Sequence, residues 1–269
     1  MSDSIRVGLI GYGYASKTFH APLIAGTPGM TLAAVSSSDA TKVHADWPIV
    51  PVASEPKHLF NDPDIDLIVI PTPNDTHFPL AKAALEAAKH VVVDKPFTVT
   101  LSQARELDAL ARSSGRLLSV FHNRRWDSDF LTVKALLSEG TLGEIVYFES
   151  HFDRFRPQVR NRWRELAGPG SGIWYDLAPH LLDQTVNLFG LPVSMTVDLA
   201  QLRPGAQTTD YFHAILSYPQ RRVVLHGTML AAAESARYIL HGTRGSYVKF
   251  GLDPQEDHLK NGERLPQED

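Results

Sequence analysis

The chain has 269 residues, of which 43% are hydrophobic and 21% are charged, and its formal net charge is −4. This composition is that of an ordinary globular protein, and the length suits two domains of about 120 to 150 residues. The charge balance gives no electrostatic reason to expect nucleic acid or an anionic membrane as a partner. No apolar run approaches the roughly 20 residues that cross a bilayer. The absence of cysteine excludes thiolate chemistry and favours a cytoplasmic location.

The chain begins with the order strand, glycine turn, helix, strand. A buried strand over Ile5–Ile10 leads into Gly11-Tyr12-Gly13-Tyr14-Ala15-Ser16, and a second strand covers Leu32–Val35. The helix between them is expected over Ser16–Ala25, and Pro22 should end or kink it. This order is typical of a dinucleotide-binding unit, in which the glycines let backbone approach a pyrophosphate at the positive end of the helix. Ser16 replaces the third glycine of the motif, where a small side chain suffices.

The end of the second strand indicates which dinucleotide is bound. The acid that would hold the ribose of NAD is missing, and Ser36, Ser37 and Ser38 stand there with Lys42 one turn on. Hydroxyl groups and a lysine suit the 2′-phosphate of NADP(H), which an acid would repel. Alternatively, the serines and Asp39 form a polar turn that caps the next helix. We expect NADP(H) in preference to NAD(H).

The chain changes character near residue 121. Before it, apolar strands (66–70, 90–93 and 117–121) alternate with helical patterns (78–89 and 100–115), which is typical of a parallel sheet. After it, long strands (145–155, 193–202, 211–218, 222–229 and 237–241) alternate apolar and polar residues, with helices over 127–139 and 176–189. We therefore predict an α/β chain with a Rossmann dinucleotide-binding domain over 1–121. An α+β substrate-binding and oligomerisation domain, with an open and mostly antiparallel sheet, follows over 122–269.

Three loops follow strands of the expected parallel sheet, at the edge where ligands of such sheets bind. They are Pro71-Thr72-Pro73-Asn74, Asp94-Lys95-Pro96 and Phe121-His122-Asn123-Arg124-Arg125-Trp126. A lone lysine is usually a solvated charge, but the buried strand before Lys95 aims it at the cofactor edge. The cofactor-binding candidates here are Pro71, Thr72, Asn74, His77, Asp94, Lys95, Asn123 and Arg124. A core or surface position is the alternative for His77, and a surface ion pair is the alternative for Arg125.

The second half contains one candidate acid–base pair. Asp176 and His180 are four residues apart at an expected helix start, after the glycine stretch Gly170-Ser171-Gly172, so they share one helix face. An aspartate can orient a histidine, and a histidine can take a hydroxyl proton near neutral pH. The alternative is a capping Asp176 beside a partly buried His180. Asp183, one turn on, suits a structural role or the rim of a pocket.

Two other kinds of chemistry lack sequence support. The 12 histidines include no His-x-x-x-His or His-Glu-x-x-His pattern, and thiolate ligands are absent, so no metal site is expected. Scattered histidines are assigned to core or surface positions; these are His20, His122, His151 and His213. No Gly-x-Ser-x-Gly elbow indicates acyl transfer.

Together, Gly11-Tyr12-Gly13, the Pro71–Asn74 loop, Asp94-Lys95-Pro96 and the Asp176–His180 pair resemble the glucose–fructose oxidoreductase/inositol dehydrogenase/rhizopine-catabolism (Gfo/Idh/MocA) family. Within it, three segments resemble the branch of NADP-dependent scyllo-inositol dehydrogenases; these are Ser36-Ser37-Ser38, Phe19-His20-Ala21-Pro22 and residues 121–126. Asp94 stands where the family pattern has glutamate.

The resemblance implies an oxidoreductase that uses NADP(H) and acts on a cyclic polyol or sugar. Lys95, Asp176 and His180 would be its catalytic set, and Arg156, Trp163 and Tyr175 are candidates for the pocket rim. The resemblance also implies a homodimer or homotetramer formed through the second-domain sheet. Because family members usually add a further strand and a long helix, the second domain is expected to be incomplete at its C-terminus. Two alternatives remain, a cofactor-recycling glycosidase or lyase of the same family and a non-catalytic NADP(H) sensor.

Overall fold

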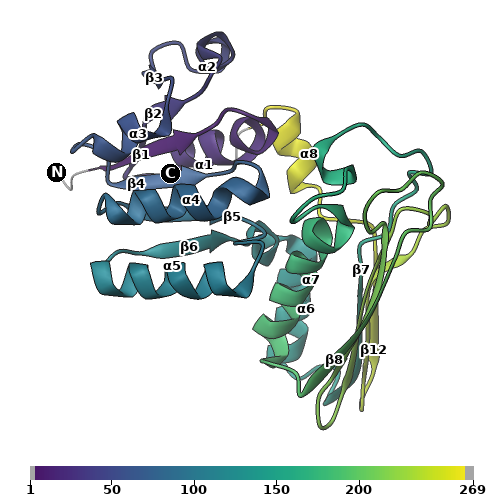
Figure 1. Cartoon of the computed structure of the whole chain (residues 1–269). Coiled ribbons are helices and arrows are strands. Elements are labelled where there is room, and N and C mark those ends of the chain that lie inside the picture. The colour runs from purple at the N-terminus through teal and green to yellow at the C-terminus, as the bar shows by residue number, and fades with distance from the viewer. Residues whose placement is uncertain (1–3, 264–269) are drawn as a thin grey trace. The chain divides into compact units, whose positions relative to one another are not determined.

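The chain folds into two compact units (Figure 1). A computed structural model describes residues 4–263; the first unit holds residues 4–121 and 254–263, and the second holds 122–253. From the sequence, residues 254–263 were expected in the second domain, but the structure groups them with the first. The reason is that α8 (Gln255–Lys260) packs on the helix after the glycine turn, where the Tyr14 hydroxyl donates a 3.1 Å hydrogen bond to Glu256. Within residues 4–263, no helix is long and apolar enough to cross a bilayer.

The first unit contains a parallel sheet of six strands in the order β3-β2-β1-β4-β5-β6. This is the strand order of a dinucleotide-binding Rossmann fold, so the predicted fold is confirmed. The strands are β1 (Ile5–Ile10), β2 (Met30–Ser36), β3 (Val52–Ala53), β4 (Leu67–Ile70), β5 (His90–Asp94) and β6 (Leu118–Phe121). The helices are η1 (Ser16–His20), α1 (Ala21–Gly26), α2 (Ala40–Asp46), α3 (Pro56–Asn61), α4 (Asn74–Glu86) and α5 (Leu101–Ser114).

The central strands of this sheet bury both faces. Val69 of β4 packs into one apolar cluster, while Ile68 and Ile70 pack into another on the opposite side. Strands covered on both sides need continuous apolar sequence, which is why these runs were readable as strands of a parallel sheet. The ends of α5 also follow the sequence, because Thr100 caps its start and Gly115 ends it in the left-handed conformation.

The helix after the glycine turn continues past Pro22 rather than ending there. It forms the π-helical segment η1 and then α1, with Pro22 in the first turn of α1. Proline has no N–H to donate, so the wider π turn falls where a regular helical hydrogen bond cannot form. The helix therefore continues to Gly26 instead of ending at Pro22.

The second unit contains a mixed sheet in the order β12-β11-β7-β10-β9-β8, in which only β7 and β10 among the described strands pair in parallel. One face packs on α7, and the shared core includes Phe148, Leu181 and Phe212 (Figure 1). The strands are β7 (Ile145–His151), β8 (Ser194–Ala200), β9 (Tyr211–Ser217), β10 (Arg222–Thr228), β11 (Ala236–Gly242) and β12 (Ser246–Phe250). The helices are η2 (Asn123–Trp126), α6 (Ser128–Ser138), η3 (Trp163–Glu165) and α7 (Gly172–Phe189). The mostly antiparallel α+β unit is confirmed, and β12 is an additional strand.

Helix α7 begins four residues earlier than predicted because Gly172 lies against the backbone of a neighbouring loop. The N–H of Ile173 donates to the carbonyl of Thr209 at 2.9 Å. Gly172 has φ of +87°, and a Cβ there would lie 2.4 Å from Oγ1 of Thr209 and 2.6 Å from Oγ1 of Thr208. Only glycine fits both this conformation and this contact.

We predict that Gly172→Ala lowers the free energy of unfolding by more than about 2 kcal/mol, because the new methyl group adds backbone strain and a steric clash. Urea denaturation of the full chain measures this change. Gly168→Ala is the matched control, since a Cβ at Gly168 meets no atom within 4 Å. Equal destabilisation by the two variants would contradict this account of the helix start.

Candidate active site

The predicted cofactor residues of the first unit gather at the edge where its parallel strands end. The turn after β1, the serines after β2 and the loop after β4 enclose a hollow of about 460 Å³. The predicted residues that line it are Gly11, Tyr12, Gly13, Ser36, Ser37, Ser38, Lys42 and Thr72. Three segments that are distant along the chain therefore line one hollow, at the edge where open α/β sheets bind ligands.

The glycine turn has the geometry that a pyrophosphate needs. Gly11 has φ of +81°, and its N–H donates to the carbonyl of Ser36 at 2.7 Å, which ties the turn to the end of β2. The hydroxyl of the buried Ser16 donates to the carbonyl of Gly11 at 2.9 Å, so serine is accommodated at the third position of the motif. A Cβ on Gly13 would meet no protein atom within 4 Å. Protein packing therefore does not require glycine at this position. Close approach of a dinucleotide to Gly13 stays a prediction.

Both interpretations of the serine run describe part of the structure. Asp39 caps α2, because its carboxylate accepts from the backbone N–H of Lys42 at 3.3 Å. The Lys42 ammonium lies 3.5 Å from the same carboxylate and is largely exposed. Ser37 and Ser38 still line the hollow beside Lys42. The segment therefore caps a helix and also presents hydroxyl groups and a cation to the site.

The two tyrosines of the glycine turn direct their hydroxyl groups to other partners. Tyr12 donates to Asp46 at 2.9 Å, and Tyr14 donates to Glu256. Burial and the neighbouring Asp46 raise the pKa of Tyr12, so its phenol stays neutral. Both tyrosines border a second hollow, of about 900 Å³, that also includes Lys260. Any contact of Tyr14 with a dinucleotide in the smaller hollow would come from its backbone or ring.

Lys95 directly follows β5 at the same sheet edge. Its backbone N–H donates to the carboxylate of Asp94 at 2.7 Å, and Nε2 of His20 lies 3.6 Å from the other carboxylate oxygen. Burial opposes ionisation of Asp94, but His20 and Lys95 outweigh burial and lower the pKa of that carboxyl. The His20 ring packs on Phe121 at 4.3 Å between centroids. His20 is therefore a close neighbour of the Asp94 carboxylate. The sequence singled out the surrounding Phe19–Pro22 run but did not predict this neighbour.

His77 connects two of the strand-end loops. The ring is fully buried, with Nδ1 2.8 Å from the carbonyl oxygen of Pro96 and Nε2 2.9 Å from that of Thr72. Its position favours the core alternative, in which His77 connects two strand-end loops. Asn74 is the buried first residue of α4 rather than part of a loop.

In the second unit, Asp176 and His180 lie one turn apart inside α7. The cap of this helix is Ser171, so the capping alternative for Asp176 is wrong. Its carboxylate lies 3.5 Å from Nε of Arg164 and 3.9 Å from a terminal nitrogen of Arg154. His180 is 6% exposed. The spacing still places both side chains on one helix face.

The predicted cleft residues Asn123 and Arg124 belong to η2 of the second unit. Arg124 is buried and forms a 3.0 Å ion pair with Asp127. Burial raises the pKa of Asp127 to about 6, against the effect of Arg124. Arg125 forms a bidentate ion pair with Asp183 at 2.6 and 2.7 Å, which agrees with the ion-pair alternative given for it from the sequence. Arg124 therefore has a structural partner, and a cofactor contact for it stays a prediction.

The strand order, the glycine turn and the strand-end hollow define a dinucleotide-binding protein of the Rossmann class. Residues 5–122 match the family model described as an oxidoreductase family with an NAD-binding Rossmann fold. Residues 134–269 match the C-terminal alpha/beta domain of the same oxidoreductase family. The chain belongs to the Gfo/Idh/MocA family of oxidoreductases, so the resemblance is confirmed at the level of the family.

Several relatives match nearly the whole chain. It is 87% identical over 269 residues to the uncharacterized oxidoreductase YdgJ of Escherichia coli, covering 78% of that protein. It is 41% identical to the scyllo-inositol 2-dehydrogenase (NADP(+)) IolW of Bacillus subtilis, with 99% of this chain and 74% of that one covered. A solved oxidoreductase of Yersinia pestis superposes with a TM-score of 0.94 at 73% identity, covering 99% and 76% of the two chains. The biliverdin reductase of Synechocystis, solved with biliverdin and NADP+, superposes with a TM-score of 0.79 at 26% identity. The match covers 93% of this chain and 81% of the reductase.

Proposed function

We propose that this oxidoreductase uses NADP(H) and transfers hydride between the nicotinamide and a ring carbon of a cyclic polyol or sugar, with scyllo-inositol as the first substrate to test. The observation that carries the proposal is the position of Lys95, which follows β5 at the sheet edge that also forms the cofactor hollow. The printed activity of IolW, at 41% identity, supports this class of substrate.

NADP(H) is the proposed cofactor because of what lines the hollow. Ser37 and Ser38 offer hydroxyl groups, and Lys42 offers a cation where a 2′-phosphate would lie. The Asp39 carboxylate also lines this hollow, but it caps α2 and pairs with Lys42. The name of the relative IolW includes NADP(+), and the Synechocystis reductase was solved in complex with NADP+.

In the proposed reaction, NADP(H) supplies the hydride acceptor for oxidation or the donor for reduction. His180 takes the proton of the substrate hydroxyl during oxidation and returns it during reduction. Asp176 positions His180 from the same face of α7. Lys95 donates a hydrogen bond to the substrate oxygen as negative charge develops there, which is worth roughly 3 to 4 kcal/mol for one donor in a site closed to water.

A screen of NADP+ reduction over inositols and common sugars, with NAD+ run alongside, tests the proposal. We expect NADPH to accumulate with at least one polyol or sugar. Substrate cleavage without net NADPH would instead identify the cofactor-recycling alternative. Tight NADPH binding without turnover of any substrate in the panel would identify the sensor and contradict the proposal.

We also propose a cytoplasmic homodimer or homotetramer that forms through the sheet face of the second unit opposite α7. Strand alternation places Ile215 and Val248 on that face, because their neighbours Leu216 and Tyr247 pack against the core. Both side chains are at least 40% exposed. Light scattering on the purified chain measures the oligomeric state.

A further inference from the structure

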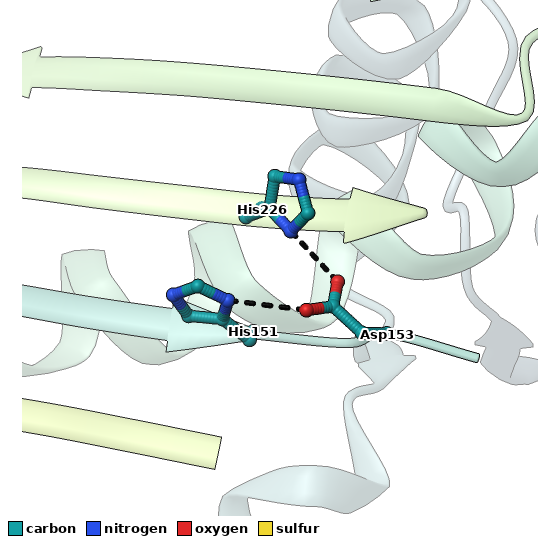
Figure 2. Close-up of side chains that lie close together, drawn as sticks. All are labelled: His151, Asp153 and His226. Carbon is teal, nitrogen blue, oxygen red and sulfur yellow. Dashed lines mark hydrogen bonds and ion pairs between the residues drawn. The ribbon is translucent and has the colours of Figure 1, made fainter. Parts of the chain in front are cut away.

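Three potential metal ligands meet on the second-unit sheet, on the face opposite α7. His151 ends β7, Asp153 follows two residues later, and His226 lies on β10 directly beside His151 in the parallel register (Figure 2). Phe152, between the first two ligands, packs into the core with α7. Since successive side chains of an extended chain point to opposite faces, the cluster is separated from His180, which lies near Phe152.

The atoms of this cluster are arranged as ligands of one ion would be. Nδ1 of His226 lies 2.7 Å from one carboxylate oxygen of Asp153, and Nδ1 of His151 lies 3.2 Å from the other (Figure 2). One ligand atom from each residue falls within 4.8 Å of the other two. Tetrahedral zinc, with bonds of about 2.1 Å, holds its ligand atoms roughly 3.4 Å apart. Side-chain movements of less than about 1 Å would therefore seat an ion.

A fourth residue supports the cluster from outside. Nε2 of His151 lies 3.1 Å from a carboxylate oxygen of Glu149, two residues back on the same face of β7. A histidine that binds metal through one nitrogen characteristically donates its other N–H to a carboxylate, which fixes the tautomer and the ring orientation. Glu149 holds His151 in this way, with Nδ1 turned toward Asp153 and His226. The side chains of the three potential ligands are also mostly buried, at 19%, 7% and 19% exposure for His151, Asp153 and His226.

We propose that His151, Asp153 and His226 bind one divalent transition-metal ion of the zinc class. Two imidazole nitrogens and one carboxylate suit Zn²⁺, Co²⁺ or Ni²⁺, whereas Mg²⁺ and Ca²⁺ prefer oxygen ligands alone. Three protein ligands leave a fourth position for water. The ion would connect β7 to β10. The proposal departs from the expectation, made from the sequence, that no metal is bound. Histidine patterns on one helix could not reveal it, because Asp153 and His226 are 73 residues apart.

The alternative is a cluster held by hydrogen bonds alone, and metal titration of the full chain distinguishes the two. After treatment with a chelator and its removal, calorimetry with ZnCl₂ and the visible absorption of Co²⁺ report binding directly. We expect one ion per chain, with affinity reduced more than about 100-fold by Asp153→Asn or His226→Gln. Glu149→Gln should weaken binding by about 10- to 100-fold.

His241→Gln is the matched control, because His241 lies on the same sheet face but bonds Ser246 instead of the cluster. It should bind Zn²⁺ as the unaltered chain does. Zn²⁺ should also raise the Tm of the unaltered chain and of His241→Gln, but not that of His226→Gln. If Asp153→Asn does not fold, His226→Gln decides the question. The proposal is overturned if the unaltered chain binds no stoichiometric ion, or if His226→Gln binds it equally well.

Discussion

Replacing Lys95 with alanine is expected to lower kcat by at least about 100-fold while NADPH binding stays nearly intact. One preorganised donor to a developing negative charge is worth about 100- to 1,000-fold in kcat. Alanine keeps the backbone N–H that donates to the carboxylate of Asp94, so this hydrogen bond at the end of β5 survives the change. Steady-state kinetics with the best substrate of the screen, together with NADPH fluorescence titration, separates turnover from cofactor binding.

Lys82→Ala is the matched control for this prediction. Lys82 is also a lysine of the first unit, but it forms an exposed ion pair with Glu106 on the helical surface. Exposed pairs of this kind contribute about 0 to 1 kcal/mol to stability. Turnover of Lys82→Ala should equal that of the unaltered chain. Unchanged turnover in Lys95→Ala would remove Lys95 from the mechanism.

Replacing Ser37 with aspartate is expected to shift cofactor preference from NADP(H) toward NAD(H). Ser37 lines the hollow, and its hydroxyl accepts from the N–H of Asp39 at 3.1 Å, a contact that an aspartate can also make. A new carboxylate there would repel a 2′-phosphate, and like charges in contact cost several kcal/mol. The ratio of kcat/KM for NADP+ to that for NAD+ should fall by roughly 100-fold, since each 1.4 kcal/mol is about tenfold.

Ser102→Asp serves as the control for added charge. Ser102 is an exposed residue in the first turn of α5, so an aspartate there adds the same charge without entering the cofactor hollow. Its cofactor ratio should not change. A Ser37→Asp variant that still selects NADP(H) would refute the role assigned to the serines.

The sequence predicted those parts of the fold that depend on local pattern. The buried runs of β1, β4 and β5 and the caps of α5 are readable because each depends on neighbouring residues. The elements that were missed are short, such as α3 and β3, and packing in the rest of the unit stabilises them more than their own sequence does. The start of α7 was misplaced because a distant contact, between Gly172 and the Thr208–Thr209 segment, sets it.

The candidate sites also divide into features set by local sequence and features set by contacts between distant residues. The gathering of the strand-end loops at one sheet edge could be predicted because parallel strands deliver their following loops to the same edge, whichever residues pair along the sheet. The approach of His20 to Asp94 and the cluster around Asp153 could not be predicted. Each depends on the register of segments that are far apart in the chain, and a single sequence does not contain that register.

Transfer of label from substrate to cofactor tests the central claim most directly. The chain would be incubated with NADP+ and a cyclic polyol deuterated at its ring carbons, beginning with scyllo-inositol, and the nicotinamide product would be analysed by mass spectrometry. We predict NADPH that carries one deuterium at C4, formed faster than NADH from NAD+. Unlabelled or undetectable NADPH with every polyol and sugar in the panel would contradict the account.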